Sequence, residues 1–274
     1  MKVAVIGYGF VGKAFVNGLK ENVSIKIIDP LLETKVDDLK AFDPEIIFIS
    51  VPTPMNADGT QDISILSKVT KEIISLRLSA MVVLKSTVLP SYIESFKNKF
   101  NSFVFNPEFL REKSANDDFI NPSMILFGGS KEDCKRLSDF YREHTKCKTN
   151  DYISLDALTA SLIKYSLNSF LATKVIFFNE LKDIFNELDS DVSWESFTEI
   201  LSLDTRVGKS HMQVPGPDGR TGYGGACFPK DTNALHSYSK ELGKEFSLLK
   251  KVISINNDIR SKYNELIQRE LEQN

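Results

Sequence analysis

Cys227 stands in a setting that favours a reactive thiolate. The surrounding segment, residues 224–231, reads GGACFPKD, and Pro229 is typical of the first turn of a helix. A cysteine at a helix N-terminus gains from the helix dipole and the free backbone N–H groups, and Lys230 adds a positive charge nearby. Asp231 lies four residues after Cys227, so both side chains would face one side of this helix. The pattern therefore favours chemistry at Cys227 over the usual state of a free cysteine, a small buried hydrophobic side chain.

Lys164 and Asn168 form a second pair with helical spacing. They are four residues apart in a segment without Gly or Pro, so they would lie on one face of a helix. Taken alone, such a pair beside an apolar stripe is also what a solvated helix edge would show. The pair becomes a candidate site only together with polar residues from other parts of the chain.

Other polar residues follow directly after predicted strands. Glu108 and Glu112 come after the apolar run 103–105, and similar short runs precede two further polar segments. In a doubly wound sheet the ligand crevice lies at the carboxyl ends of the strands, so three such ends would converge on it. An isolated pair of glutamates is more often a surface feature. The candidate residues at these ends are Pro52, Thr53, Ser86, Thr87, Glu108 and Glu112.

A glycine turn predicts a dinucleotide site near the N-terminus. Residues 7–12 read GYGFVG, a G-x-G-x-x-G motif between a predicted strand and a predicted helix. The glycines permit the tight turn, the approach of a pyrophosphate and close packing of helix on strand, and the helix N-terminus faces the phosphates. Asp29 ends the second strand, where an acid accepts both ribose hydroxyls of NAD and disfavours NADP. The alternative is a glycine turn without a ligand. The predicted NAD-binding residues here are Gly7, Gly9, Phe10, Val11, Gly12 and Asp29.

Strands and helices alternate over about the first 130 residues. Short apolar runs predict buried strands, and the stretches between them have helical spacing. This order predicts an α/β fold with a Rossmann-type, doubly wound parallel sheet covered by helices on both faces. The predicted strands are Val3–Ile6, Ile25–Ile28, Ile46–Val51, Met81–Leu84, Phe103–Phe105 and Met124–Phe127, and the predicted helices are Val11–Lys20, Ile63–Ile74 and Tyr92–Phe100.

The pattern changes near residue 150. Residues 156–188 predict one long central helix, which should cross a domain boundary or build a dimer interface. Residues 213–225 are rich in Gly and Pro and predict a loop. Further helices are predicted over Val192–Leu203, Pro229–Leu242 and Phe246–Leu271. We therefore expect a Rossmann domain over residues 1–150 and a helical central and dimerisation domain, carrying Cys227, over residues 151–274.

Composition excludes several classes of protein. The 274 residues hold 34 Lys and Arg against 37 Asp and Glu, a net charge of −3, which argues against a nucleic-acid protein held by bulk charge. The sequence has three cysteines, Cys134, Cys147 and Cys227, which are too few for a disulfide framework and fit no zinc spacing. We therefore expect no metal site. We also expect a reduced, cytoplasmic setting. We see no signal peptide and no apolar run of the ~20 residues that a membrane span needs.

Seven segments together resemble the UDP-glucose/GDP-mannose dehydrogenase family. They occur in the family's order over roughly residues 1–260, which makes a chance match implausible. The Phe after Cys227 resembles the UDP-glucose members more than the GDP-mannose ones. The segments are GYGFVG at 7–12, SVPTP at 50–54, KSTVLP at 85–90, NPEFLRE at 106–112, KYSLN at 164–168, DTRVG at 204–208 and GYGGACFPKD at 222–231.

The resemblance implies a four-electron oxidation of a nucleotide-sugar C6 alcohol to a carboxylate, UDP-glucose to UDP-glucuronate, with two NAD⁺ and one water. In its first step Asp231 and Lys164 would handle the alcohol proton through a water held with Asn168. Lys164 and Asn168 would also stabilise the oxyanion that forms later.

The second half of the implied reaction is covalent. Cys227 would attack the aldehyde to give a thiohemiacetal, and a second hydride transfer would give a thioester. Water oriented by Glu112 and Thr87 would hydrolyse this thioester. The resemblance also adds Pro52, Thr53, Ser86, Thr87, Glu112 and Lys230 to the cofactor-binding residues.

The substrate site implied by the resemblance draws on both domains. The 108–110 stretch would bind the nucleotide sugar largely through its backbone, and Arg206 matches an arginine that reaches a neighbouring subunit's substrate. A homodimer through the helical domain is therefore implied. The substrate-binding residues are Glu108, Phe109, Leu110, Lys164, Asn168, Arg206, Tyr223, Gly224 and Gly225.

The sequence also departs from the family pattern. Members typically continue into a second Rossmann-like domain that grips the UDP, whereas this sequence stops at Asn274, and the connection from Asp29 to Ile46 is shorter than usual. Either the 213–225 loop suffices, or a partner chain supplies the rest, or substrate use is altered. The alternatives are a dehydrogenase of another nucleotide sugar or small alcohol, and an NAD-binding protein without turnover. A 3-hydroxyacid dehydrogenase would share the glycine turn and long helix but would not need Cys227.

Overall fold

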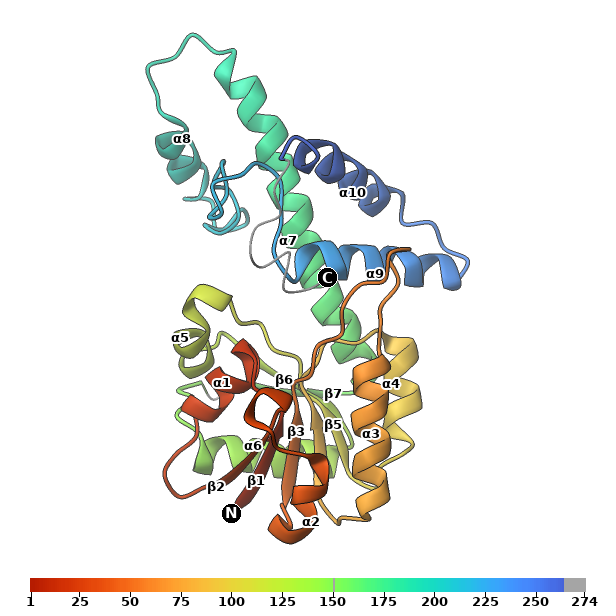
Figure 1. The fold of residues 1–274 in the computed structure, drawn as a ribbon. Coiled ribbons are helices and arrows are strands. Elements are labelled where there is room, and N and C mark those ends of the chain that lie inside the picture. The colour runs from red at the N-terminus through yellow and green to blue at the C-terminus, as the bar shows by residue number, and fades with distance from the viewer. Residues whose placement is uncertain (150, 264–274) are drawn as a thin grey trace. The chain divides into compact units, whose positions relative to one another are not determined.

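The computed structural model describes residues 1–149 and 151–263 (Figure 1). The chain divides into two compact units, and each is described separately. Unit 1 comprises Met1–Thr53 and Gln61–Lys164, and unit 2 comprises Pro54–Thr60 and Tyr165–Asn274. The two domains predicted from the sequence, residues 1–150 and 151–274, remain a prediction.

Unit 1 is built on a seven-stranded sheet with the order β2-β1-β3-β4-β5-β6-β7. All neighbouring pairs are parallel except β5 and β6, which are antiparallel. The predicted α/β class is confirmed, with this one pair as a departure from an all-parallel sheet. The strands are β1 Lys2–Ile6, β2 Ser24–Ile28, β3 Ile46–Ile49, β4 Met81–Leu84, β5 Phe103–Phe105, β6 Ile125–Gly129 and β7 Tyr152–Leu155.

Helices cover both faces of this sheet because its central strands are apolar on both sides. Ala4 and Ile6 of β1 belong to one hydrophobic cluster, and Val3 and Val5 belong to the other. The first cluster includes side chains of α3 (Ser64–Leu76) and α4 (Pro90–Lys97); the second includes side chains of α1 (Phe10–Asn17), α5 (Ala115–Ile120) and α6 (Lys131–His144). The short elements are η1 Pro30–Leu32, η2 Val36–Asp38, α2 Leu39–Phe42 and η3 Glu112–Ser114.

Unit 2 is helical, as predicted. The long helix α7, Ala157–Asn186, begins in unit 1 and continues through unit 2, where it is joined by α8 Trp194–Leu201, α9 Phe228–Glu241 and α10 Ser247–Arg260. Phe178 packs with Trp194 of α8, and Ile176 packs with Val252 of α10. The predicted last helix ends at Arg260 rather than continuing, and its predicted residues 264–271 lie outside the described residues. Within the described chain, no helix combines the length and the apolar character that crossing a membrane requires.

Candidate functional site

The glycine turn of unit 1 connects β1 to α1, and close contacts require glycine at two of its three glycine positions. Gly7 has a φ of +91°, and a Cβ there would lie 2.5 Å from the carbonyl oxygen of Ser50. A Cβ on Gly12 would lie 2.2 Å from the carbonyl oxygen of Gly7, so the helix can approach the strand only without a side chain. A Cβ on Gly9 would meet nothing within 4 Å. The turn therefore leaves open space at Gly9, the N-cap of α1.

Asp29 faces this turn from the end of β2. Its Oδ2 accepts a hydrogen bond of 2.7 Å from the backbone N–H of Tyr8, and its Oδ1 accepts one of 2.9 Å from Leu31. A carboxylate has about four lone-pair positions, so two remain for ribose hydroxyls. The α1 N-terminus, which begins at Phe10 and Val11, offers N–H groups for a pyrophosphate. These features fit an NAD cofactor.

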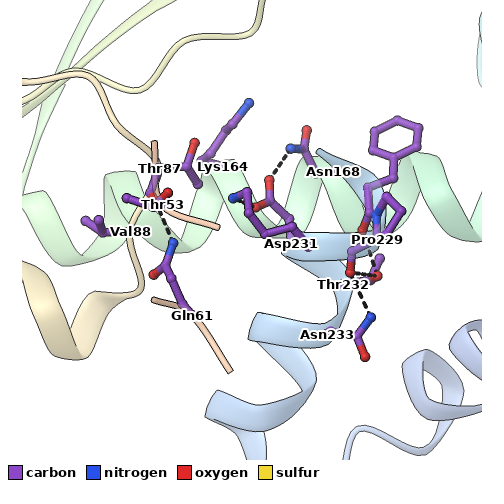
Figure 2. A network of polar contacts seen from close by, with 12 residues as sticks. Thr53, Gln61, Thr87, Val88, Lys164, Asn168, Pro229, Asp231, Thr232 and Asn233 are labelled. Carbon is purple, nitrogen blue, oxygen red and sulfur yellow. Dashed lines mark hydrogen bonds and ion pairs between the residues drawn. The ribbon is translucent and has the colours of Figure 1, made fainter. Parts of the chain in front are cut away.

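Polar bonds tie the ends of β3 and β4 together within unit 1. The carbonyl oxygen of Thr87 accepts hydrogen bonds from Oγ1 of Thr53, at 2.8 Å, and from Nε2 of Gln61, at 2.7 Å (Figure 2). Ser86 donates to the carbonyl oxygen of Val51, at 2.7 Å. Gln61 is buried but belongs to no motif, and it lies in the polar stretch NADGTQD at 56–62, so no pattern in the sequence distinguished it. Pro52 is exposed beside Thr53.

A buried ion pair links the β5 loop to the start of α7, again within unit 1. Nζ of Lys164 lies 3.4 Å from Oε1 of Glu108, and both side chains are buried. Oε2 of Glu108 accepts the N–H of Leu110 at 2.6 Å, and Lys164 lies over the ring of Phe109 at 5.2 Å. Glu108 is therefore the carboxylate that contacts Lys164, whereas Glu112, at the start of η3, is exposed.

In unit 2 the start of α9 brings together four of the predicted residues. Cys227 is the half-buried N-cap residue, and its carbonyl oxygen accepts the N–H of Asp231 at 2.8 Å. Nδ2 of Asn168 on α7 donates to Oδ2 of Asp231 at 2.6 Å, and both side chains are buried (Figure 2). Lys230 pairs with the other oxygen of Asp231. One carboxylate thus holds an amide and an ammonium one turn after the cysteine.

Two asparagines hold the loop that precedes Cys227. Asn256 of α10 accepts the N–H of Tyr223 at 2.7 Å and donates to the carbonyl oxygen of the same residue at 3.1 Å. Asn179 of α7 accepts the N–H of Gly222 at 2.9 Å. The predicted substrate-binding loop Tyr223, Gly224 and Gly225 is therefore anchored by residues that no motif contains. In the sequence, only the presence of an amide among apolar residues of a predicted helix could have indicated these two asparagines.

Arg206 lies on the surface of unit 2. Its side chain is 88% exposed and forms hydrogen bonds with both oxygens of Asp204, the shortest at 2.5 Å. This exposure leaves the guanidinium accessible from outside the chain. Among the residues that the structure describes, no group of three or more His, Cys, Asp or Glu is placed to hold a metal ion.

Comparison with known families matches two successive parts of the chain. Residues 17–145 match the NAD binding domain of the UDP-glucose/GDP-mannose dehydrogenase family, and residues 158–258 match the central domain of the same family. The two matches follow the order of a nucleotide-binding unit and a helical unit.

Curated relatives of this chain include UDP-glucose 6-dehydrogenases. The UDP-glucose 6-dehydrogenase of Rickettsia bellii is 32% identical over 94% of this chain and 67% of the relative. UDP-glucose 6-dehydrogenase YwqF of Bacillus subtilis is 33% identical over 78% of this chain and 49% of the relative. The chain thus spans about half to two thirds of the length of these relatives.

Solved structures give the fold. A UDP-glucose dehydrogenase from Pyrobaculum islandicum has a TM-score of 0.70 at 26% identity and covers 94% of this chain and 68% of its own. The 3-hydroxyisobutyrate dehydrogenase of Mycobacterium tuberculosis has a TM-score of 0.71 at 16% identity and covers 97% of this chain and 95% of its own. At that identity the second likeness concerns the fold alone.

Proposed function

We propose that this chain, which belongs to the UDP-glucose/GDP-mannose dehydrogenase family, oxidises UDP-glucose at C6 to UDP-glucuronate with NAD⁺. The observation that carries the proposal is Cys227 at the start of α9, with Asp231 one turn later bonded to Asn168. The relatives named as UDP-glucose 6-dehydrogenases support the choice of sugar. We propose residues 1–150 as the NAD-binding domain and residues 151–274 as the catalytic and dimerisation domain.

The first oxidation needs a base for the C6 hydroxyl proton. Asp231 is buried and already oriented by the amide of Asn168, so it can hold a water that takes this proton. NAD⁺, when bound at the glycine turn, accepts the hydride of each oxidation. Lys164, four residues before Asn168 on α7, donates to the substrate oxygen from the same helix face.

The second oxidation proceeds on Cys227. Its thiolate forms a C–S bond to the aldehyde carbon, and the carbonyl oxygen takes a proton, giving a thiohemiacetal. Loss of the C6 hydride and of the hydroxyl proton gives a thioester. Water, oriented by Glu112 and Thr87, adds to the thioester carbon, and the C–S bond breaks to release the acid and the thiol. Lys164 and Asn168 stabilise the oxyanion of these steps.

The remaining residues bind the cofactor and the substrate. Pro52, Thr53, Ser86 and Lys230 complete the NAD site that the glycine turn begins. The backbone of Glu108, Phe109 and Leu110 and the loop Tyr223, Gly224 and Gly225 hold the nucleotide sugar. The ion pair between Glu108 and Lys164 supports this reading, because it holds the catalytic ammonium at the same loop.

We also propose a homodimer through the helical domain, in which Arg206 reaches the substrate of the partner subunit. Phe170, Phe177 and Ile184 support it, because these exposed apolar side chains recur every seven residues along α7. Such a spacing keeps them on one helix face, as helices that pair along their length require.

A stoichiometric assay tests the proposal. UDP-glucose, UDP-N-acetylglucosamine, UDP-N-acetylmannosamine, GDP-mannose and 3-hydroxyisobutyrate are each supplied in limiting amount with excess NAD⁺, and NADH is followed by absorbance. Two NADH per UDP-glucose are expected. One NADH per 3-hydroxyisobutyrate and none from the sugars would assign the chain to the simpler dehydrogenases instead. No NADH from any substrate, with protein that binds NAD, would leave a binding protein and reject the proposal.

A further inference from the structure

Lys85 is a buried cation at the end of β4 that the proposed reaction does not use. Its side chain is only 4% exposed. Nζ donates to Oδ1 of Asn106 at 2.9 Å and to the hydroxyl of Tyr141 at 3.4 Å, and it lies over the ring of Phe15 at 5.7 Å. None of these three partners is a carboxylate, so the ammonium is held mainly by dipoles and a ring. Burial of a charge without a charged partner costs free energy, so the presence of a lysine here requires an explanation.

The partner that Lys85 shares with Tyr141 is the side chain of Asn106. The hydroxyl of Tyr141 donates to Oδ1 of Asn106 at 2.6 Å, and Nδ2 of Asn106 donates to the carbonyl oxygen of Leu126 at 2.9 Å. The backbone N–H of Asn106 donates to Leu84 at 2.8 Å. Bonds from β4, β6 and α6 thus fix the residue at which the β5 strand becomes a loop.

That loop carries Glu108 two residues later. The Glu108 carboxylate accepts the N–H of Leu110 and pairs with Lys164, so its position depends on the path of the backbone from Asn106. Lys85 also acts on it through space. The titratable groups that raise the pKa of Lys85 are the carboxyl of Glu108, first, and the thiol of Cys147. Burial raises the pKa of the Cys147 thiol, so this thiol is uncharged at neutral pH and contributes little to the attraction.

We propose that Lys85 is a positioning residue that holds the carboxylate of Glu108 on Lys164. This inference rests on the proposed function, in which Lys164 acts on the substrate oxygen. The charged Lys85 fixes Asn106 at the start of the loop and attracts the Glu108 carboxylate from the side of the sheet. The competing explanation is a purely structural role, in which Lys85 stabilises the fold. In that case its removal would lower the melting temperature.

The test uses Lys85→Met, which keeps the length of the side chain and removes its charge. We expect kcat to fall at least tenfold, the KM for NAD to stay within twofold, and the melting temperature not to fall. Burial lowers the pKa of Lys85 to about 8, so the wild-type kcat should decline as the pH rises through this value. That decline should be absent in the variant. Lys99→Met, at an exposed lysine over the ring of Phe96, is the matched control and should leave every quantity unchanged.

Hydrogen exchange followed by mass spectrometry gives a readout that needs no turnover. Peptides covering residues 106–112 should exchange about tenfold faster in Lys85→Met, and peptides of β1 should not change. Tyr141→Phe, which removes one bond to Asn106, should give a smaller change in the same direction, and it replaces Lys85→Met if that variant does not fold.

The outcomes separate the two levels of the proposal. A folded Lys85→Met with wild-type kcat, pH profile and exchange would overturn the positioning role, and so would a large loss of melting temperature with unchanged catalytic constants. If the wild-type protein oxidises no nucleotide sugar, the proposed function fails. The exchange of residues 106–112 then still decides whether Lys85 holds the loop.

Discussion

The amide of Asn168 donates a hydrogen bond of 2.6 Å to the carboxylate of Asp231, 63 positions later in the chain, and both side chains are buried. Asp231→Asn removes the charge and the proton acceptor from this pair. We expect kcat for UDP-glucose to fall about 100- to 1,000-fold, as for loss of a general base. Steady-state NADH formation measures it. Asp139→Asn, at a half-exposed aspartate paired with Lys135, is the control and should stay within twofold of wild type. A variant with full activity would exclude Asp231 as the base.

Cys227→Ser replaces the proposed nucleophile by a hydroxyl that is far less acidic. We expect the variant to stop after the first oxidation, because a serine alkoxide does not form at neutral pH. NADH yield and product mass spectrometry measure it: at most one NADH per UDP-glucose should appear, and no acid. Cys134→Ser is the matched control, since this buried thiol already contacts the carbonyl oxygen of Phe127 and a hydroxyl can do the same. UDP-glucuronate from Cys227→Ser would remove the thioester from the mechanism.

Asp29→Asn tests the ribose site. Each carboxylate oxygen of Asp29 already accepts one backbone N–H, and an amide can replace only one of these acceptors. We expect the affinity for NAD to fall about tenfold, consistent with a charge-assisted hydrogen bond of about 1.5–3 kcal/mol. Affinity for NADP should fall less, because the repulsion of its 2′-phosphate disappears. Titration calorimetry measures both, with Glu33→Gln, an exposed acid in the same turn, as control. Unchanged NAD affinity would place the ribose elsewhere.

Phe177→Glu tests the dimer. Phe177 is 58% exposed in the middle of the apolar face of α7, between Phe170 and Ile184. A carboxylate at the centre of a buried interface is strongly unfavourable, so sedimentation should show a dimer for the wild type and a monomer for the variant. Ile65→Glu, at a 43% exposed position of α3, is the control and should remain a dimer. A wild-type monomer that oxidises UDP-glucose would reject the dimer and the role of Arg206.

The sequence predicted the sheet well where strands are apolar on both faces and poorly elsewhere. The runs at Ile46–Ile49 and Met81–Leu84 are fully buried and were recognisable as strands. Tyr152–Leu155 is a half-exposed edge strand, and it lacks such a run. Helix α6 has mostly polar side chains, which hide the buried stripe of Cys134, Leu137 and Tyr141. The antiparallel direction of β6 depends on how the chain returns after β5, which no local pattern encodes.

The sequence predicted residues of the candidate site within single segments, but not the contacts between residues of different segments. Motif spacing identified Cys227 and Asp231, because they are one helical turn apart in one segment. The pairing of Glu108 with Lys164 joins positions 56 apart, so it follows only from the fold. Gln61, Asn106 and Asn256 were not predicted, because the sequence does not distinguish a buried amide from an exposed one.

The pH dependence of stability gives an independent test of the buried charge of Lys85. Burial lowers its folded-state pKa to about 8 from an ordinary 10.5, so between these values the unfolded chain binds more protons than the folded one. Lys85 therefore destabilises the folded state below pH 8, and this destabilisation disappears as the pH rises toward 10.5. The shift corresponds to about 3 kcal/mol. We expect the free energy of unfolding of the wild type, relative to Lys85→Met, to rise by about this amount from pH 7 to pH 11. Urea denaturation measures it, and Lys99→Met should show no such trend. Parallel curves for wild type and Lys85→Met would mean that Lys85 is solvated in the folded protein.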